Sequence, residues 1–370
     1  MRALVLALAL LSTVAHADDE PAGSIIFARG GQLFRTDTRG RGETAIATLP
    51  AKATVRALRT DAAGKILLVD LGGKWLWMPL DGTAALAELP CADGPAQLAE
   101  DGACVLCSAA KGAQIVNLSN GKTTPIEIPA PGARLARTGA DRVLVWTNGK
   151  SVLTAPPRAP KQSKVVAPEA PLRGFSPSPD ASHAFGVYAD EIYVDAHHKK
   201  PADVLEVFAL DGQGARRKSV KTGVPFEWSH DSQWALVQDG SQACIVHAAG
   251  GEYKCWRGFS PASIAPDGKY ALLLYARDKK PPPPPPRKLP KDKHGRVILP
   301  KVKDAPPPPP PDEPSDEDTD ETEAPAEDVA IPPPSGPLSL YRGQLEGAFT
   351  TAPQLIVRAV DGAAVWVPAP

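Results

Sequence analysis

Short apolar runs recur along the chain, and tight-turn residues separate them. Between residues 65 and 89 three such runs follow one another, joined by Gly72-Gly73 and Asp81-Gly82. Two-residue connections of this kind favour β-hairpins because glycine adopts the positive φ that suits the right-handed twist of paired strands. Similar signals recur at Gly30-Gly31, Asn120-Gly121, Asn148-Gly149, Asp211-Gly212, Gly250-Gly251 and Asp361-Gly362. Sustained helical periodicity is absent, so the pattern predicts an antiparallel meander.

The hairpins form a repeat. Each unit has an apolar residue, then a turn that carries Asp or Gly, then a second apolar run. The turn acids lie mostly about 40 residues apart, which is the blade period of a β-propeller. These acids are Asp61, Asp101, Asp141, Asp180, Asp231 and Asp267. The apolar residues that align before the turns are Leu58, Leu98, Leu135, Phe175, Trp228 and Ile264.

A single four-stranded sheet cannot bury both of its faces, whereas sheets stacked around an axis cover one another. We therefore expect the aligned apolar residues to lie on innermost strands and to pack between blades. Six repeats are visible, and the strands expected at residues 24–29 and 32–37 have no inner strand before them. The run from Gln354 to Val367 is the candidate for that strand. The prediction is an all-β β-propeller of seven blades, closed by N- and C-terminal strands in one composite blade; six blades is the alternative.

Three segments carry the repeat most clearly: Phe175–Asp180, Trp228–Ser232 and Ile264–Gly268. Each places an aromatic or apolar residue and a Ser or Ala shortly before a turn with Pro, Asp or Gly. These segments resemble the repeats of TolB-like propellers, within the broader group of WD-repeat-like propellers, although the Gly-His and Trp-Asp signatures of true WD repeats are missing. The resemblance implies the fold and says little about activity, because propellers host many activities.

Residues 1–17 have the pattern of a secretory signal peptide. A basic start at Arg2 precedes an apolar stretch from Ala3 to Leu11, and the small residues Ala15 and Ala17 mark a cleavage site. The stretch is shorter than the roughly 20 residues of a membrane span, and no later segment is long and apolar enough. We expect a soluble mature protein outside the cytoplasm: secreted, periplasmic or extracellular.

The expected propeller occupies residues 18–278 and 338–370, and a proline-rich insertion at 279–337 interrupts it. Two six-proline runs, Pro281–Pro286 and Pro306–Pro311, flank a basic stretch, and the acidic stretch Asp312–Asp328 follows. Such composition predicts extended, disordered chain. The insertion falls between the second and third strands of its blade, and Asp195–Asp203 is a smaller insertion at the equivalent place two blades earlier. Both are expected on one face, as a docking arm or as a tolerated spacer.

The chain has five cysteines, so at least one lacks a partner within the chain. A four-residue turn at Ala248–Gly251 sets Cys244 opposite Cys255, which predicts a disulfide. Cys104 and Cys107 have the spacing of redox and zinc motifs, but they lie in an apolar strand, where residues three apart point to opposite faces. A redox or zinc site is therefore not expected, and Cys91 is a candidate partner for either one.

No catalytic, cofactor or metal site is predicted. There is no Gly-x-Ser-x-Gly elbow and no phosphate-binding glycine loop. The acids and histidines around residue 195 are interpreted as solvated, since no spacing fixes a ligand geometry; they are Asp190, Glu191, Asp195, His197, His198 and Asp203. The polar residues beside the aligned apolar positions either line the central channel or satisfy backbone groups at blade ends; they are Gln97, Arg134, Glu227 and Ser263.

The net charge of −1 gives no field that would recruit nucleic acid. The sequence favours an exported, non-enzymatic, monomeric propeller that acts as a scaffold for an unidentified protein or cell-envelope component. The alternative is a propeller that uses its central channel as an enzyme or as a small-ligand-binding protein. A purely structural surface protein is the third possibility.

Overall fold

The computed structural model describes residues 21–91, 94–109, 112–126, 132–167, 172, 174–193, 199–211, 216–219, 224–249, 254–276, 338–346, 349–350 and 352–369. The chain divides into two units, of which Met1–Lys279 with Pro334–Pro370 holds all of these residues. The expected signal peptide and the proline-rich insertion lie outside the described residues.

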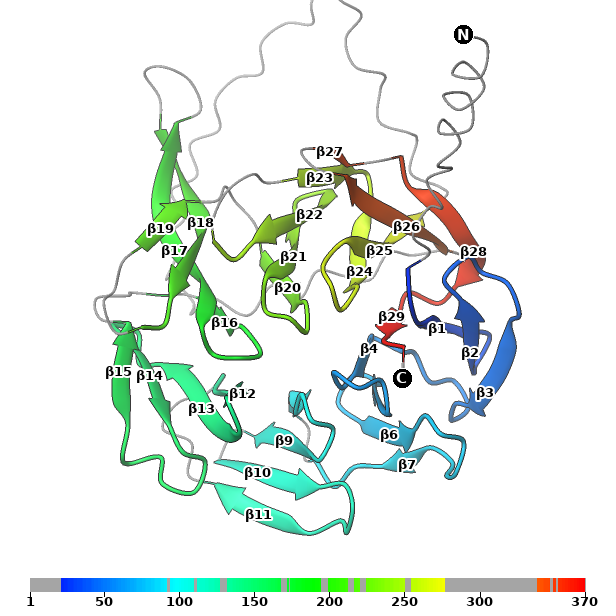
Figure 1. Cartoon of the computed structure of the whole chain (residues 1–370), viewed down its shortest axis with the longest axis horizontal. Helices are drawn as coiled ribbons and strands as arrows, with labels where there is room; N and C mark the ends of the chain where they lie inside the picture. The colour runs from blue at the N-terminus through cyan, green and yellow to red at the C-terminus, as the bar shows by residue number, and fades with distance from the viewer. Residues whose placement is uncertain are drawn as a thin grey trace, which may run out of the picture. The chain divides into compact units, whose positions relative to one another are not determined.

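The described strands form seven antiparallel sheets that follow one another around a central axis (Figure 1). Each sheet is a blade and takes the name of its inner strand. The β29 blade holds β29 (Ala364–Val367), β1 (Ser24–Arg29), β2 (Gln32–Asp37) and β3 (Thr44–Thr48). The β4 blade holds β4 (Ala57–Thr60), β5 (Ile66–Asp70), β6 (Trp75–Pro79) and β7 (Ala87–Glu88). The β8 blade holds β8 (Ala96–Leu98), β9 (Cys104–Ala109), β10 (Gly112–Asn117) and β11 (Thr123–Ile126). The β12 blade holds β12 (Arg134–Thr138), β13 (Asp141–Thr147), β14 (Val152–Ala155) and β15 (Lys164–Ala167).

The remaining blades continue the ring. The β16 blade holds β16 (Gly174–Pro177), β17 (His183–Tyr193), β18 (Lys199–Ala209) and β19 (Arg216–Ser219). The β20 blade holds β20 (Val224–Trp228), β21 (Trp234–Asp239), β22 (Gln242–His247) and β23 (Lys254–Arg257). The β24 blade holds β24 (Ser260–Ile264), β25 (Tyr270–Ala276), β26 (Leu338–Glu346) and β28 (Gln354–Val360), with β27 (Phe349–Thr350) paired to the end of β26. The prediction of an all-β, seven-bladed propeller is confirmed.

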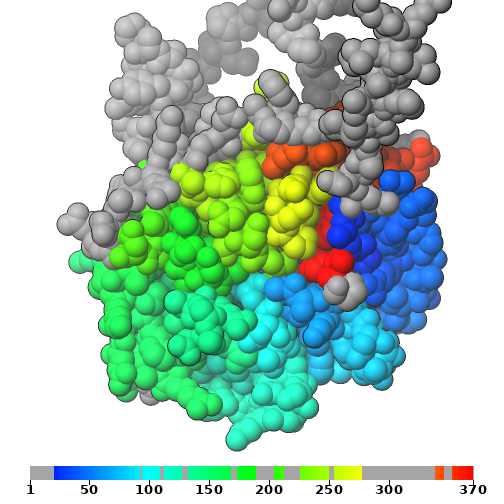
Figure 2. Space-filling view, viewed as in Figure 1, coloured from blue at the N-terminus to red at the C-terminus, as the bar shows by residue number. Residues whose placement is uncertain are grey.

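The ring closes through a composite blade. β29 pairs antiparallel with β1, so the last strand of the chain lies beside the first, and Figure 2 shows the blue and red ends of the chain in contact. The run from Gln354 to Val367, expected to act as one closing segment, is in fact divided. β28 pairs with β26 as the outer strand of the β24 blade, and β29 alone closes the ring. The turn at Asp361-Gly362 separates them, with Gly362 at a φ of 98°.

The blades pack face to face through apolar side chains. The aligned apolar residues lie on inner strands, and all are buried except Phe175, which is half-buried. Phe185 and Leu205 of the β16 blade, for example, share one cluster with Trp228 and Val237 of the β20 blade. Burial on both sides of a sheet explains why a single blade is not stable alone and why the ring must close.

Turns at the ends of the inner strands define one face of the ring, the turn face. Here the Asp101, Asp231 and Asp267 carboxylates each accept a hydrogen bond from the backbone N–H two residues later. These Asx-turns explain why an acid recurs at this place in the repeat. Asp141 differs, because it begins β13. Neighbouring turns bond to one another: the N–H groups of Ala62, Arg137 and Asp231 donate to carbonyls of the following blade.

The opposite face, the loop face, carries the connections between second and third strands. Tyr193 pairs with Lys199 at the end of the β17–β18 hairpin, and Ala276 pairs with Leu338 where β25 and β26 begin to separate. The topology therefore directs both connections toward the same face, since second strands all run in the same sense relative to the axis. Within the described part of the chain, no helix is long and apolar enough to cross a membrane.

Two disulfides are present. Cys244 of β22 lies directly opposite Cys255 of β23, and their sulfurs are joined. Cys91 is bonded to Cys107 of β9, which settles the pairing that the sequence left open. Cys104 is a buried free thiol, and burial raises its pKa, which disfavours the reactive thiolate form.

Candidate functional site

A cavity of about 540 Å³ lies on the axis of the ring. Its walls come from the inner strands β4, β8, β12, β16 and β20 and from the residues that flank them. On the loop face it is bordered by Arg56 and the β5–β6 turn, and toward the turn face it reaches Glu100 and His230. Its volume is within the range of about 300–1,000 Å³ that is typical of ligand pockets. The central channel is therefore the candidate site.

The residue immediately before each aligned apolar residue occupies the clasp position. Gln97 donates from Nε2 to the carbonyl of Leu135 on the next inner strand and accepts from the N–H of Leu135, both at 2.7 Å. Glu227 accepts from the N–H of Ile264 on the next inner strand at 2.8 Å. Inner-strand backbone groups that face a neighbouring blade have no strand partner on that side, so these side chains satisfy them. The clasp position links one blade to the next.

The other two clasp residues predicted from the sequence behave differently. Arg134 lines the cavity beside Leu135. Ser263 is only 1% exposed and is not among the residues that line the cavity, because β29 covers it. Its hydroxyl instead accepts from the N–H of Trp366 at 3.3 Å, so it too links neighbouring blades. Of the two roles that the sequence left open, Gln97 and Glu227 have both, since they line the cavity and also bond to backbone groups of the next blade. Arg134 lines the cavity, and Ser263 bonds to a backbone group at a blade junction.

A hydrogen bond crosses the channel near the turn face. His230 follows β20 and Glu100 follows β8, and Nδ1 of His230 lies 2.6 Å from Oε2 of Glu100. Their blades are three apart in the ring, so the pair spans the cavity that both residues line. Burial alone lowers the pKa of His230, but the hydrogen bond and charge of Glu100, aided by Glu227 and Asp61, outweigh it and raise that pKa. The imidazolium form is favoured at this position.

Glu227 has an unusual environment for a carboxylate. Burial raises its pKa, although the N–H of Ile264, the charge of Arg59 and the hydroxyl of Ser263 oppose that shift. A carboxyl group with a raised pKa in a cavity is a feature of some catalytic acids. Here Oε2 of Glu227 already accepts a hydrogen bond from the N–H of Ile264. Among the described residues, the only hydrogen-bond partner of the His230 side chain is Glu100. Within that part of the chain, no nucleophile is paired with this histidine.

The lining of the cavity includes cationic and aromatic side chains. Arg56 and Arg59 lie before and within β4, and both line the cavity. Gly72 makes room for the first guanidinium, because a Cβ at residue 72 would lie 2.6 Å from Nε of Arg56. Phe226, on the blade across the channel, is 44% exposed although it is large and apolar. Arg56, Arg59 and Phe226 were not predicted from the sequence, because only the residues at the clasp position were considered as channel residues. The repeat alignment does place Glu100 and His230 at equivalent positions, two residues after Leu98 and Trp228.

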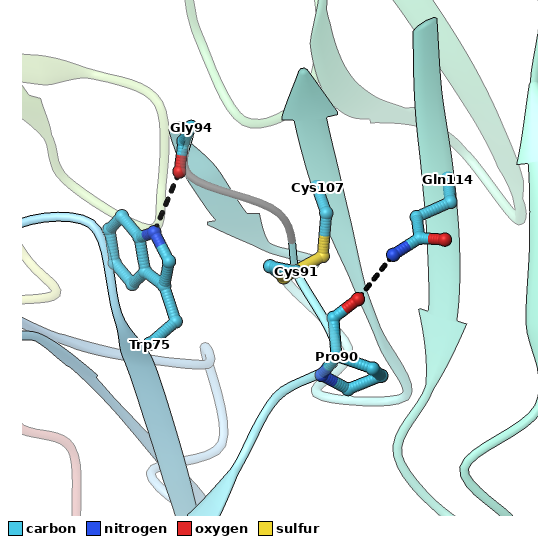
Figure 3. Close-up of a disulfide and its surroundings, with 6 residues drawn as sticks. All are labelled: Trp75, Pro90, Cys91, Gly94, Cys107 and Gln114. Atoms are coloured by element: carbon cyan, nitrogen blue, oxygen red, sulfur yellow. Dashed lines mark hydrogen bonds between the residues drawn. A yellow bond between two sulfur atoms is a disulfide. The ribbon is translucent and has the colours of Figure 1, made fainter.

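One side of the cavity is held by the Cys91–Cys107 disulfide (Figure 3). The connection from β7 to β8 carries Gly94, whose carbonyl accepts from the Trp75 indole at 2.8 Å. Gln114 of β10 donates to the carbonyl of Pro90 in the same connection. Trp75 and Gly94 both line the cavity, so these three links fix the wall of the site to two blades.

Metal binding has no support in the described part of the chain. No group of three or more His, Cys, Asp or Glu side chains is arranged to hold an ion among the described residues. Asp195, His197 and His198 lie outside the described residues, and of Asp190, Glu191 and Asp203 only the backbone is described. The interpretation of these groups as solvated stays a prediction.

No family model matches this chain, and no curated protein matches it. Several solved structures are similar over most of the ring. Hydrazine synthase from Kuenenia stuttgartiensis is 10% identical over 60% of this chain and 74% of its own, with a TM-score of 0.41. The dihydro-heme d1 dehydrogenase NirN in complex with DHE is 16% identical over 69% and 68%, with a TM-score of 0.42. A chain of a nidogen/laminin complex is 16% identical over 68% and 84%, with a TM-score of 0.35. These distant similarities assign neither a family nor an activity, and the resemblance to TolB-like propellers stays a prediction.

Proposed function

We propose that this chain is an exported, non-enzymatic β-propeller that holds a protein or another component of the cell envelope on its loop face. Export is supported by the signal-peptide pattern of residues 1–17 and by two disulfides, which form and persist in oxidising compartments. The observation that carries the proposal is the placement of the long connections. The β17–β18 and β25–β26 strand pairs both separate at the loop face, the face at which Arg56 and the β5–β6 turn border the channel.

A rigid ring with long connections on one face is a common design for binding, because the scaffold fixes where the loops begin and end. The non-enzymatic part rests on the use of the channel side chains. Gln97 and Glu227 are bonded to the neighbouring blades, and His230 is bonded to Glu100. These side chains stabilise the contacts between blades. Because they are already hydrogen-bonded within the protein, few of them are available for proton transfer.

The test is removal of residues 279–337, with a short Gly-Ser linker joining β25 to β26. We expect crosslinking in the native cell envelope to capture a partner with the full chain and to lose it with the shortened chain. Lys269→Glu is the matched control, since Lys269 is an exposed residue at the turn face and its substitution leaves the loop face unchanged. Circular dichroism verifies that both variants remain folded. Equal capture by the full and shortened chains would refute the docking role of this connection.

The second candidate is binding of a small ligand in the channel. The cavity supports it, because two guanidinium groups and an exposed aromatic residue line it. A channel-centred function should survive removal of residues 279–337, so the same shortened chain separates the two candidates.

A further inference from the structure

The carboxylates that line the channel are all engaged. Glu100 is bonded to His230, Glu227 accepts from the N–H of Ile264, and Asp70 accepts from the N–H of Gly72 at 2.7 Å. Each acid therefore has a fixed donor within the ring. These three carboxylates therefore already accept hydrogen bonds from donors of the protein itself.

Two cations of the same cavity have no such partner. Within the described residues, the guanidinium groups of Arg56 and Arg59 donate no hydrogen bond and form no ion pair. Arg59 feels the charge of Glu227. No hydrogen bond or ion pair joins the two side chains among the described residues, and the Glu227 oxygen that is bonded accepts from the N–H of Ile264. Among the described residues, the geometry thus leaves two guanidinium groups, each with five N–H donors, in the lining of a cavity without an acceptor for them.

Aromatic residues line the same cavity as these cations. Phe226 is one of the few large apolar residues of the described chain with more than a third of its surface exposed, and it lines the cavity. Trp75, fixed by its bond to Gly94, lines the same wall as Arg56. Guanidinium groups bind carboxylates through paired hydrogen bonds, and exposed aromatic rings pack against apolar groups.

We propose that the central channel binds a carboxylate that carries an apolar group, with Arg56 and Arg59 on the carboxylate and Phe226 against the apolar part. The source is either a free small acid or the C-terminal carboxylate of a peptide, which share this chemistry. The proposal goes beyond the docking function, because a channel site binds a small acid without a partner protein. The β5–β6 turn borders the site, since a Cβ at residue 72 would lie 2.6 Å from Nε of Arg56.

Isothermal titration calorimetry on the purified full chain tests this site with three probes. They are 3-phenylpropionate, a tripeptide that ends in phenylalanine with a free carboxylate, and the same tripeptide with an amidated end. We expect at least one carboxylate probe to bind and the amidated peptide not to bind. Binding of the acid alone indicates a small-molecule ligand, and binding of the free peptide indicates a peptide end.

Variants locate the site. Arg56→Gln and Arg59→Gln should each weaken binding by about tenfold or more, as the loss of a charge-assisted hydrogen bond predicts. Phe226→Ala should weaken it by a smaller factor. Arg358→Gln is the matched control, because Arg358 is exposed on β28, the outer strand of the β24 blade. The chain that lacks residues 279–337 should bind the probes as the full chain does, so failure of this site and failure of the docking function give different results. Absence of binding by both carboxylates, or equal binding by the arginine variants, would overturn the proposal.

Discussion

The clasp position shows how different side chains perform one task. Gln97 offers a donor and an acceptor and satisfies both backbone groups of Leu135, whereas Glu227 and Ser263 each satisfy one N–H of the next blade. The shared requirement is an oxygen that reaches the neighbouring inner strand. Because buried backbone groups without a partner are costly, these three side chains stabilise their blade junctions. The other repeats have Ala57, Arg134 and Gly174 at this position, and none of these side chains supplies such an oxygen.

Substitutions at Glu227 separate its hydrogen bond from its charge. Glu227→Ala leaves the N–H of Ile264 without an acceptor and should lower the free energy of unfolding by about 1–3 kcal/mol. Glu227→Gln keeps an acceptor, as Gln97 does in the β8 blade, and removes the ionisation that burial disfavours. The folded-state pKa of Glu227 is raised, so its contribution to stability is present below the unfolded value of 4.5 and is lost as the pH rises through the folded value. The glutamine variant should therefore gain stability relative to the native chain across that window, which urea unfolding at several pH values measures.

The pair of His230 and Glu100 predicts a second pH dependence. The pKa of His230 is raised in the folded chain, so its contribution to stability is complete below the unfolded value of 6.5 and is lost as the pH rises through the folded value. His230→Gln should therefore destabilise the chain most at slightly acidic pH, and the difference should narrow under alkaline conditions. His247→Gln is the control, since the His247 ring packs edge-on against Trp234 away from the channel. A difference between native and variant chains that is constant from pH 5 to pH 9 would contradict this role.

At the scale of strands and turns, hairpin signals were sufficient to predict most of the architecture. The four-residue turn predicted at Ala248–Gly251 implied a register that sets Cys244 opposite Cys255, and β22 and β23 pair in that register. The division of residues 354–367 was not predictable, because β28 and β29 are similar apolar runs and the choice between them depends on which blade lacks a strand. The partner of Cys91 was equally open, since it depends on how the β7–β8 connection crosses to β9.

The candidate site was less predictable than the fold. Short-range patterns identify residues next to the aligned apolar positions, so Gln97 and Glu227 were found. Arg56 precedes β4, and Phe226 faces it from a blade that is distant in sequence. Arg56 and Phe226 line the same cavity only because the ring closes, and no short-range sequence pattern indicates that they are close in space.

The cysteine arrangement makes a prediction about thiol chemistry. Five cysteines with two disulfides leave one thiol, Cys104, which is 1% exposed. A thiol reagent should label no cysteine in the native chain and one per chain in denaturant without reductant. Replacing both Cys244 and Cys255 with alanine should lower the free energy of unfolding by about 2–4 kcal/mol, since the crosslink restricts the unfolded chain. Three reactive thiols in the denatured native sequence would show that one of the two bonds does not form.

At the scale of the whole molecule, stability depends on a short last strand. β29 has four residues, all buried, and it packs against both the β24 and β4 blades. Trp366 is at the centre of this junction. Its backbone N–H is held by Ser263, its carbonyl accepts from Thr60, and its indole donates to the carbonyl of Ala22. Trp366 thus connects three parts of the chain: β24 through Ser263, β4 through Thr60, and the segment before β1 through Ala22.

Loss of this junction should affect the entire ring. Trp366→Ala removes a 2% exposed side chain and should lower the free energy of unfolding by about 3–5 kcal/mol, the usual cost of emptying a large aromatic site. Removal of residues 364–370 should be more severe, because the β1 edge and the apolar faces of two blades then meet water. Leu355→Ala on β28 is the control, since Leu355 is 40% exposed and its loss should change stability by no more than about 0.5 kcal/mol. Guanidinium-induced unfolding followed by tryptophan fluorescence measures all three. If the truncated chain unfolds at the same denaturant concentration as the full chain, β29 does not close the ring, and the blades must be stable without it.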